Sequence, residues 1–191
     1  MTNVTIFGSG NMGSAIDSVL SAGGATVDHI GSADSPGPLS GDIVILAVYH
    51  PAVDDILDKY GEYLSGKIVV DITNPVDLET FDSLVVPAHS SAAAELADEL
   101  PSSRVLKAFN TNFAATLSAK NVGPNTTMVL VAGDDADAKT TFISAVKAGG
   151  LDAIDAGGLS RARELEAMGF LQIKLAAGEH LDWTGGFGVV R

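Results

Sequence analysis

The chain contains no cysteine, which excludes a disulfide framework, a thiolate metal site and a cysteine nucleophile, and which suits a reducing compartment. Basic residues are few: 11 Lys and Arg stand against 24 Asp and Glu, so the formal net charge is −13. A surface of this charge repels nucleic acid and anionic membranes, and we expect neither as a partner. Apolar runs of about 18 residues, the length of a membrane span, are also absent. With no basic and apolar leader at the N-terminus, the sequence predicts a cytoplasmic protein.

A glycine-rich motif near the N-terminus is the most informative feature that is present. The β-rich run VTIF meets Gly8-Ser9-Gly10-Asn11-Met12-Gly13, and an apolar helical pattern follows directly. This is G-x-G-x-x-G between a strand and a helix, the layout of a Rossmann dinucleotide site. In such a site Gly8 allows a tight turn, Gly10 lets the backbone approach a pyrophosphate, and Gly13 lets the helix pack close to the sheet. The motif therefore predicts that amides at the helix start face the phosphates of a dinucleotide.

Strand and helix signals alternate along the chain, and 46% of its 191 residues are hydrophobic. This pattern predicts an α/β protein with a Rossmann-like, mostly parallel sheet and helices on both faces. We expect strands at residues 3–7, 25–30, 42–48, 67–71, 104–109, 128–132 and 151–155, and helices at residues 12–22, 52–64, 90–99, 112–120, 135–148 and 161–177. Residues 1–191 are expected to form one domain, in which residues 157–191 are a C-terminal helix and tail that closes the cleft. Only about a dozen residues separate the second and third strands, so we expect a loop there in place of a crossover helix.

In open α/β sheets the ligand lies beyond the carboxyl ends of the strands, which directs attention to the segments that follow each strand. After the glycine motif, these segments are Gly31-Ser32, Tyr49-His50-Pro51, Thr73-Asn74-Pro75 and Asn110-Thr111-Asn112. Their asparagines can recognise a ribose or a carboxamide, or can equally serve as turn residues. The second strand ends without an acid at Ser32, which favours NADP, whereas Asp34 can reach a ribose and leaves NAD open.

The sequence contains few candidates for catalytic groups. The four histidines, at positions 29, 50, 89 and 180, lack metal-ligand spacing, so we expect no metal site. His50 and its neighbour Tyr49 are the candidates at the predicted cleft, although a solvated loop histidine is an alternative. The charged residues of the last helix, Arg161, Arg163, Glu164 and Glu166, are expected to form ion pairs on the helix face.

The motifs IFGSGNMGSA, DIVILAVYHP, KIVVDITNP, VLKAFNT, VLVAGDD and DAGGLSRARELEAMG occur in this order. Together they resemble the coenzyme F420-dependent NADP oxidoreductase family over about residues 1–178. The resemblance implies an NADP(H)-binding domain, a C-terminal portion that closes the cleft over a deazaflavin, and often a homodimer. It also implies contacts to the pyrophosphate, the 2′-phosphate and the nicotinamide end of the cofactor. The cofactor-binding residues expected on these grounds are Gly8, Ser9, Gly10, Asn11, Met12, Gly13, Gly31, Ser32, Val48, Tyr49, Asn74, Pro75 and Asn110.

The resemblance predicts a reductase that passes hydride between NADP(H) and a flavin-like acceptor, with coenzyme F420 as the first candidate. In that chemistry the two redox rings react and the protein mainly orients them. Two alternatives remain. A reductase of a small imine or carbonyl would need a proton donor, for which His50 or Tyr49 are candidates. A non-catalytic dinucleotide-binding redox sensor would bind the cofactor without turnover.

Overall fold

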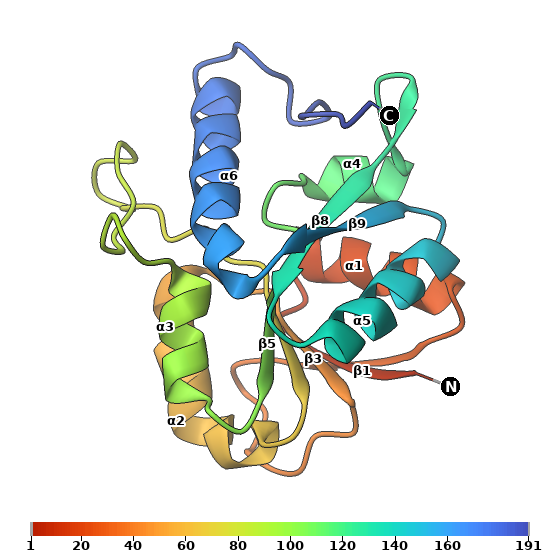
Figure 1. Ribbon diagram of the computed structural model, residues 1–191, viewed down its shortest axis with the longest axis vertical. Coiled ribbons are helices and arrows are strands. Elements are labelled where there is room, and N and C mark those ends of the chain that lie inside the picture. Colours follow the sequence, from red (N-terminus) through yellow and green to blue (C-terminus); the bar gives the residue numbers. More distant parts are fainter. Residues whose placement is uncertain (1, 191) are drawn as a thin grey trace.

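Seven strands form one sheet in the order β2-β1-β3-β4-β5-β8-β9, with helices on both of its faces (Figure 1). The computed structural model describes residues 2–190. The strands of the sheet are β1 Asn3–Phe7, β2 Thr26–Ile30, β3 Ile43–Leu46, β4 Ile68–Asp71, β5 Arg104–Lys107, β8 Met128–Gly133 and β9 Asp152–Gly157. The helices are α1 Asn11–Ala22, α2 Val53–Leu64, α3 Ala92–Glu99, α4 Ala114–Ala119, α5 Ala136–Ala148 and α6 Ala162–Ala177. The Rossmann-like, mostly parallel sheet predicted from the alternating pattern is thereby confirmed.

Strand direction changes once across the sheet. Strands β2, β1, β3, β4 and β5 are parallel neighbours, whereas β8 runs antiparallel to β5 and β9 runs parallel to β8. The β5–β8 pairing joins two residue pairs, Leu106 with Gly133 and Lys107 with Ala132. Buried strands read as apolar runs in either direction, so the sequence did not reveal this reversal. A short hairpin, β6 Asn121–Val122 with β7 Asn125–Thr126, was also not predicted.

The predicted loss of a crossover helix is confirmed, because residues 31–42 connect β2 to β3 without any helix. This connection passes close over β1 at Gly41, whose amide donates to the Thr5 hydroxyl at 3.0 Å. A Cβ atom at Gly41 would collide with the backbone of β1, so the tight passage requires glycine. Further along, Lys67 anchors the loop by donating to the carbonyl groups of Leu39 and Gly41.

Each face of the sheet has its own apolar core. One cluster joins the sheet to α1, α4 and α5, with Ile16, Leu117 and Phe142 fully buried. The other joins the sheet to α2, α3 and the start of α6, with Leu64, Leu96 and Ala162 among its members. In Figure 1 these two groups of helices lie on opposite sides of the strands. None of the helices between residues 2 and 190 is both long and apolar enough to cross a membrane.

The segment after α6 turns back toward the β6–β7 hairpin (Figure 1). There the Trp183 ring lies 4.9 Å from the ring of Phe113, centroid to centroid, and the Phe187 amide donates to the side chain of Gln172 at 3.2 Å. Trp183 nevertheless keeps 54% of its surface exposed. The tail thus covers the start of α4 loosely and leaves an aromatic face open.

Candidate functional site

The glycine motif forms the turn between β1 and α1, and two of its glycines are required by close contacts. Gly8 has φ +101°, and a Cβ atom there would lie 2.5 Å from the carbonyl oxygen of Ala47. A Cβ atom on Gly13 would collide with the carbonyl oxygen of Gly8, because α1 packs directly against the loop. Both positions therefore accept only glycine, for the turn and for the helix packing respectively.

Gly10 differs from these two glycines because its surroundings are open. It is the N-cap of α1 with ordinary extended backbone angles, and among the described residues no atom lies within 4 Å of a Cβ built there. The first amides of a helix, here those of Asn11 and Met12, have no intrahelical acceptor. No side chain of the described residues caps them. The space beside Gly10 is thus bordered by unpaired N–H groups at the positive end of a helix, which is an anion-binding arrangement.

The parallel strands bring the other predicted segments to the same edge as this loop. Gly31-Ser32 follows β2, Tyr49-His50 follows β3, Asn74-Pro75 follows β4, and Asn110 follows β5. The Tyr49 side chain is 81% exposed, and Ser32 is exposed as well. The Asp34 carboxylate accepts from the Gly31 amide at 2.7 Å and so folds back on the turn at the end of β2. That turn therefore carries both a hydroxyl and a carboxylate, the two groups that favour NADP and NAD respectively.

Asn74 and Asn110 face each other beneath α6. The Asn74 amide donates to the Asn110 carbonyl at 2.9 Å, and the Asn110 amide donates to the Asn74 side-chain oxygen at 3.0 Å and to the Leu165 carbonyl at 2.8 Å. Helix α6 approaches so closely at Gly169 that a Cβ atom there would collide with Asn74. The side-chain oxygen of Asn110 is buried and has no partner among residues 2–190. The pair is therefore held by its own contacts and by α6, and contact with nicotinamide stays a prediction.

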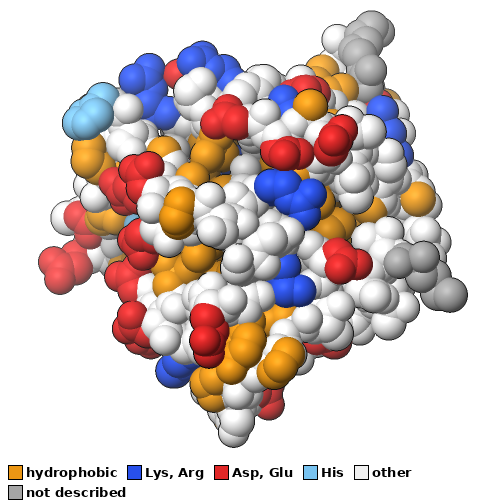
Figure 2. All heavy atoms as spheres, turned by 60° about the horizontal axis from the view of Figure 1, so that its bottom comes forward, with side chains coloured by type: hydrophobic (Ala, Val, Ile, Leu, Met, Phe, Trp, Pro, Cys, Tyr) orange, Lys and Arg blue, Asp and Glu red, His pale blue; other side chains and the backbone are white. Residues whose placement is uncertain are grey.

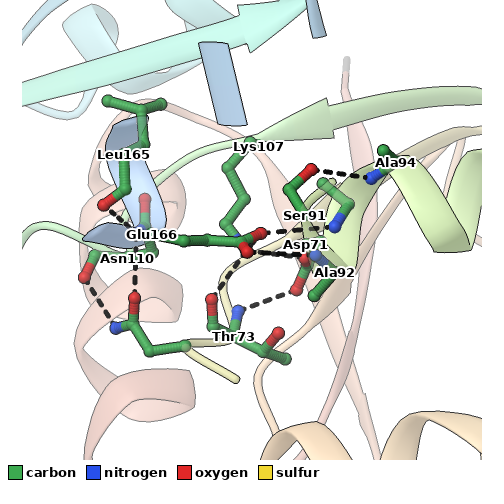
Figure 3. A network of polar contacts seen from close by, with 11 residues as sticks. Asp71, Thr73, Ser91, Ala92, Ala94, Lys107, Asn110, Leu165 and Glu166 are labelled. Carbon is green, nitrogen blue, oxygen red and sulfur yellow. Dashed lines mark hydrogen bonds and ion pairs between the residues drawn. The ribbon is translucent and has the colours of Figure 1, made fainter. Parts of the chain in front are cut away.

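A buried cluster of three charges lies directly beside this pair (Figure 3). The Lys107 ammonium contacts Asp71 at 2.7 Å and Glu166 at 2.8 Å, and it donates to the Thr73 carbonyl at 2.6 Å. The Thr73 amide in turn donates to Asp71 at 2.7 Å, so both backbone groups of Thr73 are held by the cluster. Glu166 also accepts from the amides of Ala92 and Ala93 at the start of α3. The helix dipole there offsets the second negative charge.

The expected role of Glu166 on the helix face was wrong. Arg161 and Arg163 pair with Glu164 on the exposed side as predicted, whereas Glu166 is 1% exposed. The signal was available in the helical periodicity of α6. Its buried residues are Ala162, Leu165, Glu166, Gly169, Gln172 and Ala176, a stripe with three- and four-residue spacing that includes the glutamate.

A small pocket between α2 and α3 reaches the same cluster from the other side. It is lined by His50, Val53, Asp54, Leu57, Asp71, Thr73, Ala92, Glu95, Leu96 and Glu99. Within the described chain, His50 Nδ1 and Thr73 Oγ1 are buried without a hydrogen-bond partner. Acidic side chains also gather on the surface formed by α2 and α3 (Figure 2). These carboxylates repel a phosphate, so the pocket is unsuited to an anion, whereas the glycine loop remains the predicted phosphate site.

The glycine loop, the open N-terminus of α1 and the shared strand edge define a dinucleotide-binding oxidoreductase of the Rossmann type. No family model matches the chain. The F420-dependent NADP reductase of Methanocaldococcus jannaschii is 32% identical over 161 residues, which cover 82% of this chain and 72% of that protein. This likeness identifies the chain as a member of the F420-dependent NADP reductase family.

Other relatives agree with the fold. Metalloreductase STEAP3 of Rattus norvegicus is 34% identical over 132 residues, and this chain spans only 25% of its length. A solved structure of a proposed F420-dependent NADP reductase from Arthrobacter sp. FB24 superposes with a TM-score of 0.87 over 100% of both chains, at 23% identity. The imine reductase of Streptomyces aurantiacus superposes with a TM-score of 0.63, over 91% of this chain and 61% of that chain, at 16% identity. At these identities the two structures bear on the fold alone.

Proposed function

We propose that this enzyme transfers hydride between NADP(H) and a flavin-like acceptor, with coenzyme F420 as the first candidate. The observation that carries the proposal is the open space at Gly10, which is bordered by the unpaired first amides of α1. A side chain at position 10 would fill this space. Membership in the F420-dependent NADP reductase family, through a relative covered over 72% of its length, supports the same acceptor class.

In this proposal the residues of the chain bind and orient, and a bound nicotinamide supplies the hydride. The amides of Asn11 and Met12 hold the pyrophosphate, and Ser32 accompanies the 2′-phosphate. Asn110, fixed by Asn74 and by the Leu165 carbonyl, shapes the strand edge where the nicotinamide end is expected. Helix α6 and the tail after it cover the cleft on the acceptor side. Rate enhancement then comes mainly from holding the two reacting rings in one geometry.

An imine or carbonyl reductase is the second candidate, because His50 presents a buried ring nitrogen without a partner in the described structure. Such a substrate needs a proton donor beside the nicotinamide, and Tyr49 and His50 are the titratable side chains that follow β3 at the cofactor edge. An anaerobic assay of the purified protein with NADPH or NADH separates the candidates. Coenzyme F420, FMN, FAD, a quinone and a cyclic imine are offered in turn as acceptors. Turnover of F420 or a flavin, and not of the imine, supports the proposal, and turnover of the imine alone contradicts it.

We further propose that the enzyme is a homodimer. Several large apolar side chains near α6 and the tail are half-exposed, among them Phe81, Val85, Leu171 and Trp183. Exposed apolar groups of this size commonly mark an association surface, and a two-fold dimer is the commonest closed assembly. Light scattering at micromolar concentration tests this proposal. A monomeric mass that is unchanged by removal of residues 182–191 contradicts it.

A further inference from the structure

The ring of His29, on β2, lies between two groups that can only accept hydrogen bonds. Its Nδ1 is 3.0 Å from the carbonyl oxygen of Gly8, and its Nε2 is 3.0 Å from a carboxylate oxygen of Asp17. A neutral imidazole carries one N–H and can satisfy one of these acceptors, whereas an imidazolium carries two and satisfies both. Both contacts are satisfied together only when each ring nitrogen carries a proton.

Both partners of His29 belong to the glycine loop and its helix. Gly8 opens the loop, and its amide already donates to the Ile30 carbonyl at 3.0 Å, so β2 holds both backbone groups of this glycine. Asp17 lies in the middle of α1, the helix whose first amides border the space at Gly10. Protonated His29 thus ties the turn and the helix of the candidate phosphate site to one neighbouring strand.

The electrostatic surroundings of His29 are simple. Among the described residues, Asp17 is the charged group within ion-pair distance of the ring. The adjacent Asp28 is engaged elsewhere, since it accepts from the hydroxyls of Thr5 and Ser40. The His29 side chain is 27% exposed, so its proton can exchange with solvent. A neutral ring carries one N–H, so when that proton is lost an imidazole lone pair faces one of the two acceptors and one of the two hydrogen bonds is lost.

We propose that His29 in its protonated form is a positioning residue of the nucleotide site, and that its proton couples nucleotide affinity to pH. The inference rests on the proposed function, because it takes the glycine loop as the dinucleotide site. Loss of the proton loosens the loop and removes a positive charge from its neighbourhood. Histidines in general change charge between about pH 5 and 8, so NADPH affinity should fall as the pH rises through this range.

Calorimetric titration of NADPH from pH 5.5 to 8.5 tests the coupling in the wild type and in two matched variants. His29→Asn keeps a donor for the Gly8 carbonyl but cannot titrate. Asp17→Asn offers an amide N–H to a neutral ring, so the ring no longer needs its second proton. Over this range the wild-type Kd should rise about 3- to 10-fold more than that of either variant, the equivalent of one net hydrogen bond. The ratio of wild-type to variant Kd cancels the titration of the 2′-phosphate of NADPH, which also falls near pH 6.

A ratio that stays constant across the pH range overturns the inference while leaving the proposed function intact. Failure of the wild type to bind NADPH or NADH at any pH overturns both. A second measurement does not need the nucleotide: ¹⁵N spectra of the His29 ring in the free protein should show both nitrogens protonated at pH 6. A neutral ring with a single N–H at that pH contradicts the role assigned to His29.

Discussion

The Lys107 ammonium on β5 lies 2.8 Å from the Glu166 carboxylate on α6, and both side chains are almost completely buried. The same ammonium contacts Asp71 on β4, and Glu166 also accepts from the amides at the start of α3. Two strands and two helices are therefore joined by one lysine. Because Lys107 also donates to the Thr73 carbonyl, and because the Asn110–Leu165 contact lies beside Glu166, the cluster supports the carboxyl edge of the sheet (Figure 3).

Removal of the lysine should be the most damaging change to this cluster. Lys107→Met leaves Asp71 and Glu166 as two buried carboxylates without their cation, and breaking such a pair costs about 3–5 kcal/mol. Glu166→Gln should cost less, since Asp71 and Lys107 still neutralise each other. Urea unfolding of each variant measures the free energy of unfolding. Glu164→Gln, two residues away on the exposed face of α6, is the control and should change it by less than about 1 kcal/mol.

Substitution at Gly10 should separate binding from folding. Gly10→Val places its side chain in the open space at the start of α1, so the fold should persist while NADPH binding is lost. Circular dichroism and calorimetry measure the two properties. Gly37→Val is a matched control, because a Cβ atom there also finds open space among the described residues but lies in the β2–β3 loop. Unchanged NADPH affinity in Gly10→Val would show that the phosphate site is elsewhere.

The preference for NADPH over NADH should depend on the residue at position 33. Ala33 is exposed directly after Ser32, and an arginine there can form a charge-assisted pair with a 2′-phosphate. Ala33→Arg should tighten NADPH binding about tenfold and leave NADH binding nearly unchanged. Ala33→Met adds similar length without the charge and should change neither. If NADH binding improves equally in Ala33→Arg, the turn after β2 does not read the 2′-phosphate.

Direct hydride transfer predicts different losses at two edge residues. His50→Ala should slow F420 or flavin reduction less than about tenfold, since a positioned general acid or base typically contributes a hundredfold or more. Asn110→Ala should be more harmful, because its side chain holds Asn74 and α6 at the edge where we propose that the nicotinamide end binds. Steady-state kinetics over pH 5–9 compare the variants. Near-complete loss of activity in His50→Ala, together with loss of a titration near pH 6–7, would favour the imine or carbonyl reductase.

Acid stability should depend in part on Asp155. The Lys139 ammonium donates to this carboxylate at 2.8 Å and holds the pKa of Asp155 below its usual value of 3.8. A lowered pKa in the folded state stabilises it above the unfolded value, and the stabilisation is lost as the pH falls through the folded value. The unfolding free energy of the wild type should therefore fall more steeply below pH 4 than that of Asp155→Asn. Asp98→Asn, on the exposed side of α3, serves as the control in urea unfolding at each pH.

Local patterns were sufficient to predict most elements and the candidate phosphate site. The spacing of the motif predicts a turn at Gly8, open space at Gly10 and close helix packing at Gly13. The structure shows these three features. The missing helix between β2 and β3 was also evident, because chain length limits what a connection can contain. Each of these conclusions depends on residues that are neighbours in the sequence.

The reversal at β8, the burial of Glu166 and the contacts of His29 were decided by the tertiary structure. Strand direction is set by how β8 returns to β5, which an apolar run does not encode. A glutamate on a helix is ordinarily solvated, and it becomes buried here only because Lys107 and the amides of α3 arrive from distant parts of the chain. In the same way His29 meets Gly8 and Asp17 only once β2 lies beside β1. The sequence by itself determined which backbone segment is suited to bind a phosphate. Long-range packing determined which charged side chains surround that segment, because electrostatic interactions depend on distance in space and not on separation in the sequence.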